Sequence, residues 1–134
     1  MANPLNARSI NALKGVHADL VKVAHRAAEL SPIDFIVTEG LRTQARQKEL
    51  MARGLTRTMN SRHLTGHAVD VAAVVKGKIV WVIAPYADIA KAFRQAGTEL
   101  SVQLRWGGDF NGNGLPDDKF VDAVHFELAR SQYP

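Results

Sequence analysis

Cysteine is absent from the 134 residues of this chain. This absence excludes disulfide bonds and thiolate metal sites, so any bound zinc ion would have to be held by histidine and carboxylate side chains. The sequence also lacks an apolar run long enough to span a bilayer, and it lacks the basic leader and apolar stretch of a secretory signal. We therefore expect no stable membrane insertion and a protein that initially stays in the cytoplasm where it is made.

Aromatic residues are scarce, at 7% of the chain, and they do not alternate with the basic residues. Proteins that bind single-stranded nucleic acid combine a basic groove with stacking aromatic side chains, so we expect no nucleic-acid partner. The formal net charge is +4. This charge suits an anionic partner such as a membrane surface or the bacterial wall, and it is equally compatible with a basic surface that only keeps the protein soluble.

Apolar side chains at spacings of three and four residues predict amphipathic helices. Ser31-Pro32 is expected to stop the first helix, and Thr43 is the expected N-cap of the second. Gly54 and Gly97 are expected to end the second and third helices. The predicted helices span residues 8–30, 44–53 and 85–97.

Runs of β-branched and aromatic residues predict short strands, and Lys76-Gly77-Lys78 predicts a hairpin turn between two of them. The predicted strands span residues 34–38, 68–75, 79–83, 100–106 and 121–128. This order favours an α+β fold in which helices pack against one small antiparallel sheet. No repeat, low-complexity tract or linker interrupts the sequence, so we expect residues 1–134 to form a single domain.

Two separate motifs carry side chains that bind metal ions. His63 and Asp70 flank Gly66 in the first motif, and His125 lies in the second motif, far along the chain. Side chains alternate between the faces of a strand, so Asp70 and His125 can face one cleft from neighbouring strands. Gly66 permits a bend that would turn His63 back towards Asp70. Two imidazoles and a carboxylate are the donors of an open catalytic zinc site, and we predict these three residues as its ligands.

Asp122 lies three residues before His125, so it can approach the metal without binding it, and we predict it to be the general base. Glu127 is the alternative base, because it shares a strand face with His125. His67 falls on the face opposite to Asp70 and is not expected to be a ligand. From these residues alone, a pair of core histidines with solvated acids explains the pattern equally well.

The segment before Asp122 resembles the first nine positions of a calcium-binding EF-hand loop. Asp109, Asn111, Asn113 and Asp117 supply oxygen donors at positions one, three, five and nine, and a glycine occupies position six. The twelfth position holds Phe120 where the motif requires a bidentate glutamate. A calcium site and a plain Asn-Gly turn between strands are both compatible with this segment.

The two metal-binding motifs together resemble the signature of the VanY-type zinc peptidases. The matching residues are Ser61-x-His63-x-x-Gly66-x-Ala68-x-Asp70, followed by Asp122-x-x-His125. The resemblance continues through Glu39-Gly40-Leu41-Arg42-Thr43 and Trp106-Gly107-Gly108-Asp109, and so covers roughly residues 35 to 128. The family includes D-alanyl-D-alanine peptidases and the L-alanyl-D-glutamate endolysins of tailed phages. Aspartate at position 122, where many relatives have glutamate, is typical of the endolysin branch.

The resemblance implies a hedgehog-like or DD-peptidase-like fold with one catalytic zinc ion and Asp122 as the base. It implies that Arg42 stabilises the oxyanion of the reaction and that Ser61 contacts the substrate. The structural alternatives are a surface ion pair for Arg42 and a turn-capping hydroxyl for Ser61. The endolysin branch also has a calcium-responsive loop, which favours calcium as a regulator at residues 109–117.

The function implied most directly is that of a phage endolysin, which hydrolyses the L-alanyl-D-glutamate bond of peptidoglycan and lyses the host. Such a protein would act as a monomer and would stay in the host cytoplasm until released to the wall. The first alternative is a D-alanyl-D-alanine carboxypeptidase or dipeptidase on the same fold. The second is a non-catalytic zinc module used for binding, against which the candidate base and Arg42 argue.

Overall fold

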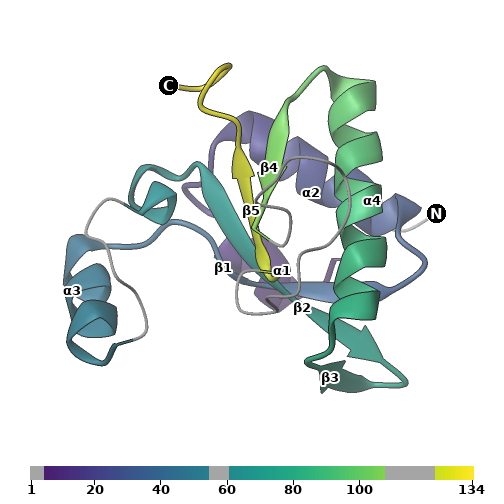
Figure 1. Ribbon diagram of the computed structural model, residues 1–134, viewed down its shortest axis with the longest axis horizontal. Coiled ribbons are helices and arrows are strands. Elements are labelled where there is room, and N and C mark those ends of the chain that lie inside the picture. The colour runs from purple at the N-terminus through teal and green to yellow at the C-terminus, as the bar shows by residue number, and fades with distance from the viewer. Residues whose placement is uncertain (1–4, 55–60, 108–122) are drawn as a thin grey trace.

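The structure is a computed structural model that describes residues 5–54, 61–107 and 123–134 (Figure 1). The helices in these ranges are α1 (Ala7–Ala12), α2 (Ala18–Leu30), α3 (Gln44–Ala52), the short 3-10 helix η1 (Arg62–Thr65) and α4 (Ile83–Leu100). The strands are β1 (Asp34–Glu39), β2 (Ala68–Val75), β3 (Lys78–Val80), β4 (Leu104–Trp106) and β5 (His125–Leu128).

The strands form one antiparallel sheet in the order β1-β2-β5-β4, with β3 paired to the outer part of β2. Helices α2 and α4 lie against each other and cover one face of this sheet (Figure 1). Phe93 of α4 stacks on Phe126 of β5 with ring centroids 4.0 Å apart, and Val69 pairs with Phe126 across the strands. The predicted α+β class with a small antiparallel sheet is therefore confirmed.

The core on the helix-covered face explains which sheet residues remain for function. Val69 and Val71 of β2 are buried in that core, so the intervening Asp70 points to the opposite face. Asp70 pairs directly with His125 of β5, and both residues therefore face the same side. The register of these two neighbouring strands thus places a carboxylate beside an imidazole.

The prediction of one helix over residues 8–30 is wrong, because the chain forms α1 and α2 with a turn between them. Gly15 adopts a left-handed φ of +81° in this turn. The imidazole of His17 then caps α2 by accepting a hydrogen bond from the Asp19 amide, with Nδ1 and N 3.1 Å apart. The apolar spacing continues across the break because both helices bury side chains in one core, so periodicity alone did not reveal the turn.

The predicted end of the third helix at Gly97 is also wrong. Helix α4 begins at Ile83, two residues before Pro85, and continues through Gly97 to Leu100. A Cβ on Gly97 would lie only 2.5 Å from the Val102 carbonyl oxygen. Glycine is therefore needed here for a close approach of the chain, and it does not mark a helix end.

Helix α4 is longer than predicted at both ends, and the strands on either side of it are shorter. The strand predicted over residues 100–106 is reduced to β4, and the strand predicted over residues 79–83 is replaced by β3, which begins one residue earlier and ends at Val80. Of the strand predicted over residues 121–128, residues 125–128 form β5, while positions 121 and 122 lie outside the described residues.

Other local predictions are confirmed. Strand β2 has the predicted bounds, and the turn at Lys76 and Gly77 has the positive φ angles of a tight hairpin. Thr43 caps α3, because its hydroxyl accepts a hydrogen bond from the Arg46 amide at 3.1 Å. None of the helices in the described part of the chain combines the length and the apolar character needed to cross a bilayer.

Gly66 joins η1 to β2 and determines how the first metal-binding motif bends. It adopts a left-handed φ of +75°, and a Cβ at this position would lie 2.6 Å from the Gly15 carbonyl oxygen. The Gly66 carbonyl accepts a hydrogen bond from the His17 amide at 2.8 Å. The bend therefore depends on a backbone conformation and a close contact that favour glycine.

We expect Gly66→Ala to destabilise the protein more than Gly54→Ala, and Gly54 is a matched control. Gly54 has a similar φ of +73°, but a Cβ there would meet nothing within 4 Å. The control should lose only the left-handed penalty of about 1–2 kcal/mol, whereas Gly66→Ala must also displace the Gly15 carbonyl. Urea denaturation would measure both free energies of unfolding, and equal losses would contradict the predicted role of the contact.

Candidate metal centre

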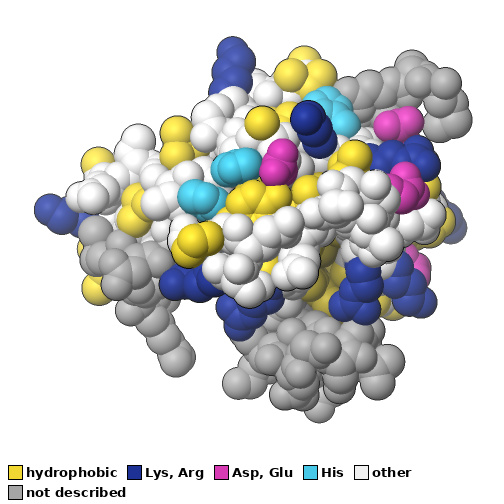
Figure 2. Space-filling view, turned by 90° about the horizontal axis from the view of Figure 1, so that it is seen from above, with side chains coloured by type: hydrophobic (Ala, Val, Ile, Leu, Met, Phe, Trp, Pro, Cys, Tyr) yellow, Lys and Arg dark blue, Asp and Glu magenta, His cyan; other side chains and the backbone are white. Residues whose placement is uncertain are grey.

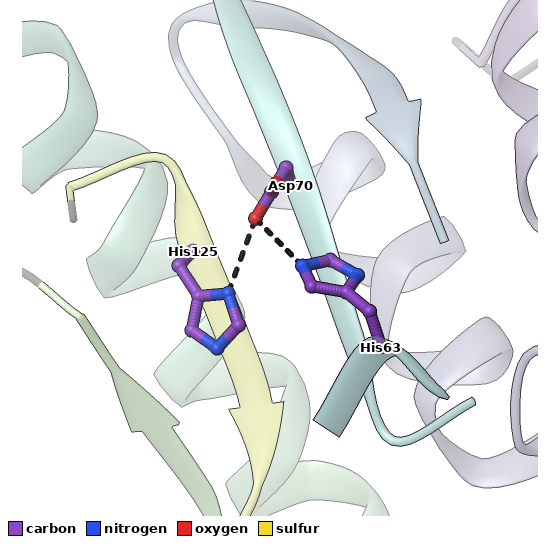
Figure 3. Close-up of side chains that lie close together, drawn as sticks. All are labelled: His63, Asp70 and His125. Atoms are coloured by element: carbon purple, nitrogen blue, oxygen red, sulfur yellow. Dashed lines mark hydrogen bonds and ion pairs between the residues drawn. The ribbon is translucent and has the colours of Figure 1, made fainter. Parts of the chain in front are cut away.

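Three side chains that are distant in the sequence meet on the sheet face opposite to α2 and α4 (Figure 3). Asp70 comes from β2, His125 from β5 and His63 from η1. Oδ1 of Asp70 lies 3.1 Å from His63 Nε2 and 3.1 Å from His125 Nδ1. One potential ligand atom from each residue lies within 4.8 Å of the others. The structure thus brings together the three residues that the sequence motifs single out.

The backbone of η1 fixes His63 within this group. His63 is almost completely buried, and its Nδ1 donates a hydrogen bond to the Gly40 carbonyl, 2.8 Å away. A proton on Nδ1 leaves the lone pair of Nε2 directed towards Asp70. The Ser61 hydroxyl caps η1 by accepting from the His63 amide at 3.2 Å. The structural alternative for Ser61, a turn cap, is therefore observed.

His125 is held from both sides by carboxylates. Its Nδ1 faces Asp70, and its Nε2 lies 3.0 Å from Oε1 of Glu127. Glu127 therefore contacts the ring nitrogen that points away from Asp70. This placement disfavours Glu127 as the general base and makes it a hydrogen-bond partner of a predicted ligand instead.

Hydrogen bonds within this group shift the pKa values of Asp70 and His125. Burial opposes ionisation of Asp70, but hydrogen bonds to His125 and His63 outweigh it and hold its pKa well below the ordinary range. Burial also opposes the charge on His125, but hydrogen bonds to Asp70 and Glu127 raise its pKa to about 9. The Asp70 carboxylate is therefore ionised at neutral pH, and in the metal-free protein it faces a protonated imidazole.

This donor set fits a divalent metal ion. Each imidazole has a hydrogen-bond acceptor on the nitrogen remote from Asp70, namely the Gly40 carbonyl for His63 and the Glu127 carboxylate for His125. Such outer contacts orient metal-binding histidines and select the nitrogen that binds. Two imidazole nitrogens and one ionised carboxylate oxygen are the ligands of open catalytic zinc sites.

Arg42 lies next to the Asp70 carboxylate oxygen that does not contact the imidazoles. Its guanidinium forms two hydrogen bonds with Glu39, at 2.7 and 2.8 Å, and one with Gln47 at 2.9 Å. Its Nη2 also lies 3.8 Å from Oδ2 of Asp70. The side chain is only 8% exposed, so it is a buried cation and not the surface ion pair considered as the alternative.

Sequence reasoning gave no role to Glu39 or Gln47. Glu39 lies in a motif of the family resemblance, but its sequence position alone does not reveal a paired carboxylate. Gln47 lies in the polar helix α3 and is completely buried, which can be recognised only from the packing. Both residues orient Arg42 and so influence the environment of Asp70.

A cleft of about 700 Å³ is lined by Arg42 and Ser61, but His63, Asp70 and His125 are not among its lining residues. A second hollow of about 520 Å³ lies between α4 and the β4–β5 strands and includes none of the predicted site residues. Figure 2 shows the Lys and Arg side chains of one face as separate groups among apolar and neutral atoms. The described residues on that face therefore form no continuous basic patch.

Several predicted residues cannot be placed in this geometry. Asp122 and the loop positions Asp109, Asn111, Asn113 and Asp117 lie outside the described residues. His67 is described, and it is not one of the three metal-binding residues. Its Nδ1 lies 2.6 Å from the Thr65 hydroxyl, and its ring lies 5.6 Å from that of His17.

The fold and the site together define a class of protein, a small α+β protein with a His–Asp–His group able to hold a metal ion. A family model described as phage L-alanyl-D-glutamate peptidase matches residues 1–129. The L-alanyl-D-glutamate peptidase of Escherichia phage T5 is 41% identical over an alignment of 124 residues, and the match covers 87% of this chain and 90% of that protein. The L-alanyl-D-glutamate peptidase of Listeria phage A118 is 32% identical over an alignment of 120 residues, and the match covers 87% of this chain and 39% of that protein.

A solved structure is also similar to this chain. The crystal structure of Serratia marcescens L-Ala D-Glu endopeptidase ChiX superposes with a TM-score of 0.85 and 42% identity, covering 99% of this chain and 96% of that one. The chain belongs to the phage L-alanyl-D-glutamate peptidase family. The predicted resemblance is therefore confirmed at the level of the family.

We expect the stability of the metal-free protein to fall as the pH rises through the titration of His125. Folding raises the pKa of His125 from 6.5 to about 9, so its contribution to stability is fully present below pH 6.5 and is lost as the pH passes 9. Urea denaturation of chelator-treated protein between pH 6 and 10 would measure the fall. His125→Asn is the control, and an equally steep fall in this variant would contradict the assignment.

Proposed function

We propose that this protein is a zinc-dependent phage endolysin that hydrolyses the L-alanyl-D-glutamate bond of peptidoglycan stem peptides and so lyses the bacterial host. The convergence of His63, Asp70 and His125 in a member of this family carries the proposal. Residues 1–134 would act as a single catalytic domain and as a monomer. The protein would remain in the host cytoplasm until it is released to the wall.

His63 Nε2, Asp70 Oδ1 and His125 Nδ1 would hold the zinc ion. When bound, zinc lowers the pKa of water towards neutrality and polarises a scissile carbonyl. The carboxylate of Asp122 would accept a proton from the attacking water and pass it to the nitrogen of the departing D-glutamate. Glu127 is engaged by His125 Nε2, which supports Asp122 over Glu127 in this role.

Arg42 would stabilise the negative charge that develops on the carbonyl oxygen of the scissile bond. Glu39 and Gln47 engage three of its N–H groups, which leaves two that these partners do not use. The same contacts hold the guanidinium in one position beside Asp70, so little reorganisation is needed during the reaction. Ser61 lines the cleft next to Arg42 and would contact the substrate there.

We expect the purified protein to cut peptidoglycan between L-alanine and D-glutamate, and only while metal is bound. Mass spectrometry of digested peptidoglycan would show stem peptides that begin with D-glutamate. Treatment with a chelator should abolish these products, and added zinc should restore them. Release of terminal D-alanine instead would identify a D-alanyl-D-alanine carboxypeptidase, and a wild type that binds zinc without any cleavage would indicate a binding module.

Asp122→Ala serves as the matched variant in this assay, since it should bind zinc like the wild type but lose nearly all turnover. General bases typically contribute roughly 10²–10⁴-fold to the rate. Zinc content after dialysis separates loss of catalysis from loss of metal. Retained cleavage by Asp122→Ala would move the role of base to another residue.

We also propose that calcium regulates the enzyme through Asp109, Asn111, Asn113 and Asp117. We expect added calcium to increase cleavage and to slow hydrogen exchange over residues 109–122, because a bound cation would order the segment that leads to the base. Asp109→Ala combined with Asp117→Ala should abolish both responses. If calcium alters neither the rate nor the exchange of the wild type, the proposal is wrong.

A further inference from the structure

Glu127 is a buried carboxylate that contacts His125, one of the predicted ligands. Glu127 is only 6% exposed, although it lies just two positions along β5 from the partly exposed His125. Burying an ionised carboxylate is costly unless hydrogen bonds and opposite charges compensate for the lost water. The Nε2 of His125 supplies the hydrogen bond, at 3.0 Å from Oε1.

Two arginines, Arg105 and the more buried Arg62, add compensating positive charge around this carboxylate. The Nε of Arg62 lies 3.7 Å from Oε2 of Glu127, while the more exposed Arg105 approaches Oε1 to 3.9 Å. The Arg62 side chain is only 10% exposed, and its buried Nε has no hydrogen-bond acceptor among the described residues. Glu127 is therefore the carboxylate towards which this buried part of the guanidinium is directed.

Two backbone carbonyls near the end of the described chain hold the Arg62 guanidinium in place. Its Nη2 donates to the carbonyl of Leu128 at 3.0 Å and to that of Tyr133 at 2.6 Å. Tyr133 is itself anchored, because its hydroxyl donates to Asp19 of α2 at 2.6 Å. A continuous series of contacts thus runs from α2 through the C-terminal segment to Arg62, Glu127 and the ring of His125.

The ring nitrogens of an imidazole are distinct, and an acceptor on one nitrogen keeps the proton there and the lone pair on the other. Because Glu127 accepts from Nε2, Nδ1 of His125 is the nitrogen left to bind a metal. We propose that Glu127 is a positioning residue that presents Nδ1 of His125 to the metal, and that Arg62 and the C-terminal carbonyls hold Glu127 in position. This inference rests on the proposed zinc site.

The test is the zinc affinity of single variants, measured by competition with a chromophoric chelator. We expect Glu127→Ala to bind zinc about 10–100-fold more weakly than the wild type, the range seen when partners of ligating histidines are removed. Glu127→Gln should show a smaller loss, because its amide oxygen can still accept from Nε2. Arg62→Met should also weaken binding, because it releases Glu127 without touching the ligand.

Glu49→Ala is the matched control, since Glu49 is an exposed carboxylate of α3 whose ion pairs with Arg46 and Arg53 lie on the surface. It should bind zinc like the wild type. Thermal denaturation of each metal-free variant identifies any that does not fold. If Glu127→Ala does not fold, the zinc affinities of Glu127→Gln and Arg62→Met, compared with that of the Glu49→Ala control, decide the proposal.

A second measurement on the zinc-loaded wild type needs no variant. Proton–nitrogen correlation spectra of the imidazoles should place the His125 proton on Nε2. A proton on Nδ1, or unchanged zinc affinity in the folded Glu127 and Arg62 variants, would overturn the positioning role while leaving the zinc site intact. A wild type that binds no zinc would overturn both this inference and the proposed zinc enzyme.

Discussion

The shared carboxylate oxygen of Asp70 is the constraint on which the functional part of this structure depends. It lies 3.1 Å from a nitrogen of each imidazole, and these two contacts join η1, β2 and β5 at one point. The direct pairing of Asp70 with His125 fixes the register of the two strands. A shift of one residue would turn Asp70 into the apolar core, so the packing of Val69 and Val71 protects the site geometry.

The site also contains buried carboxylates, and two largely buried arginine side chains supply positive charge next to them. Arg42, held by Glu39 and Gln47, stands behind Asp70, and Arg62 stands behind Glu127. Each cation faces a carboxylate that either belongs to the candidate metal-binding group, as Asp70 does, or contacts a member of it, as Glu127 does. Because water is largely excluded from these pairs, their charges and hydrogen bonds limit the orientations that the ligands can adopt.

Much of the fold could be predicted because local signals and tertiary packing agree in those places. Strand β2 is a β-branched and apolar run that is largely buried, and Thr43 caps α3. The predictions are wrong at positions where a tertiary or capping contact, and not the local sequence pattern, determines the backbone conformation. Gly97 permits the approach of Val102 inside a continuing helix, and His17 caps a helix that apolar spacing joins to its neighbour.

The sequence by itself determined the donor types, the family and the residues that should converge. With no cysteine available, only imidazoles and carboxylates could form the metal site, and the spacing around Gly66 marked the bend. Only the tertiary structure decided which nitrogen of each histidine faces Asp70, and that Glu127 forms a hydrogen bond with the other nitrogen of His125. The orientation of each ring depends on a hydrogen-bond acceptor such as the Gly40 carbonyl, which lies 23 residues from His63 in the sequence. Only folding brings such an acceptor next to the ring, and no periodic pattern in the sequence indicates it.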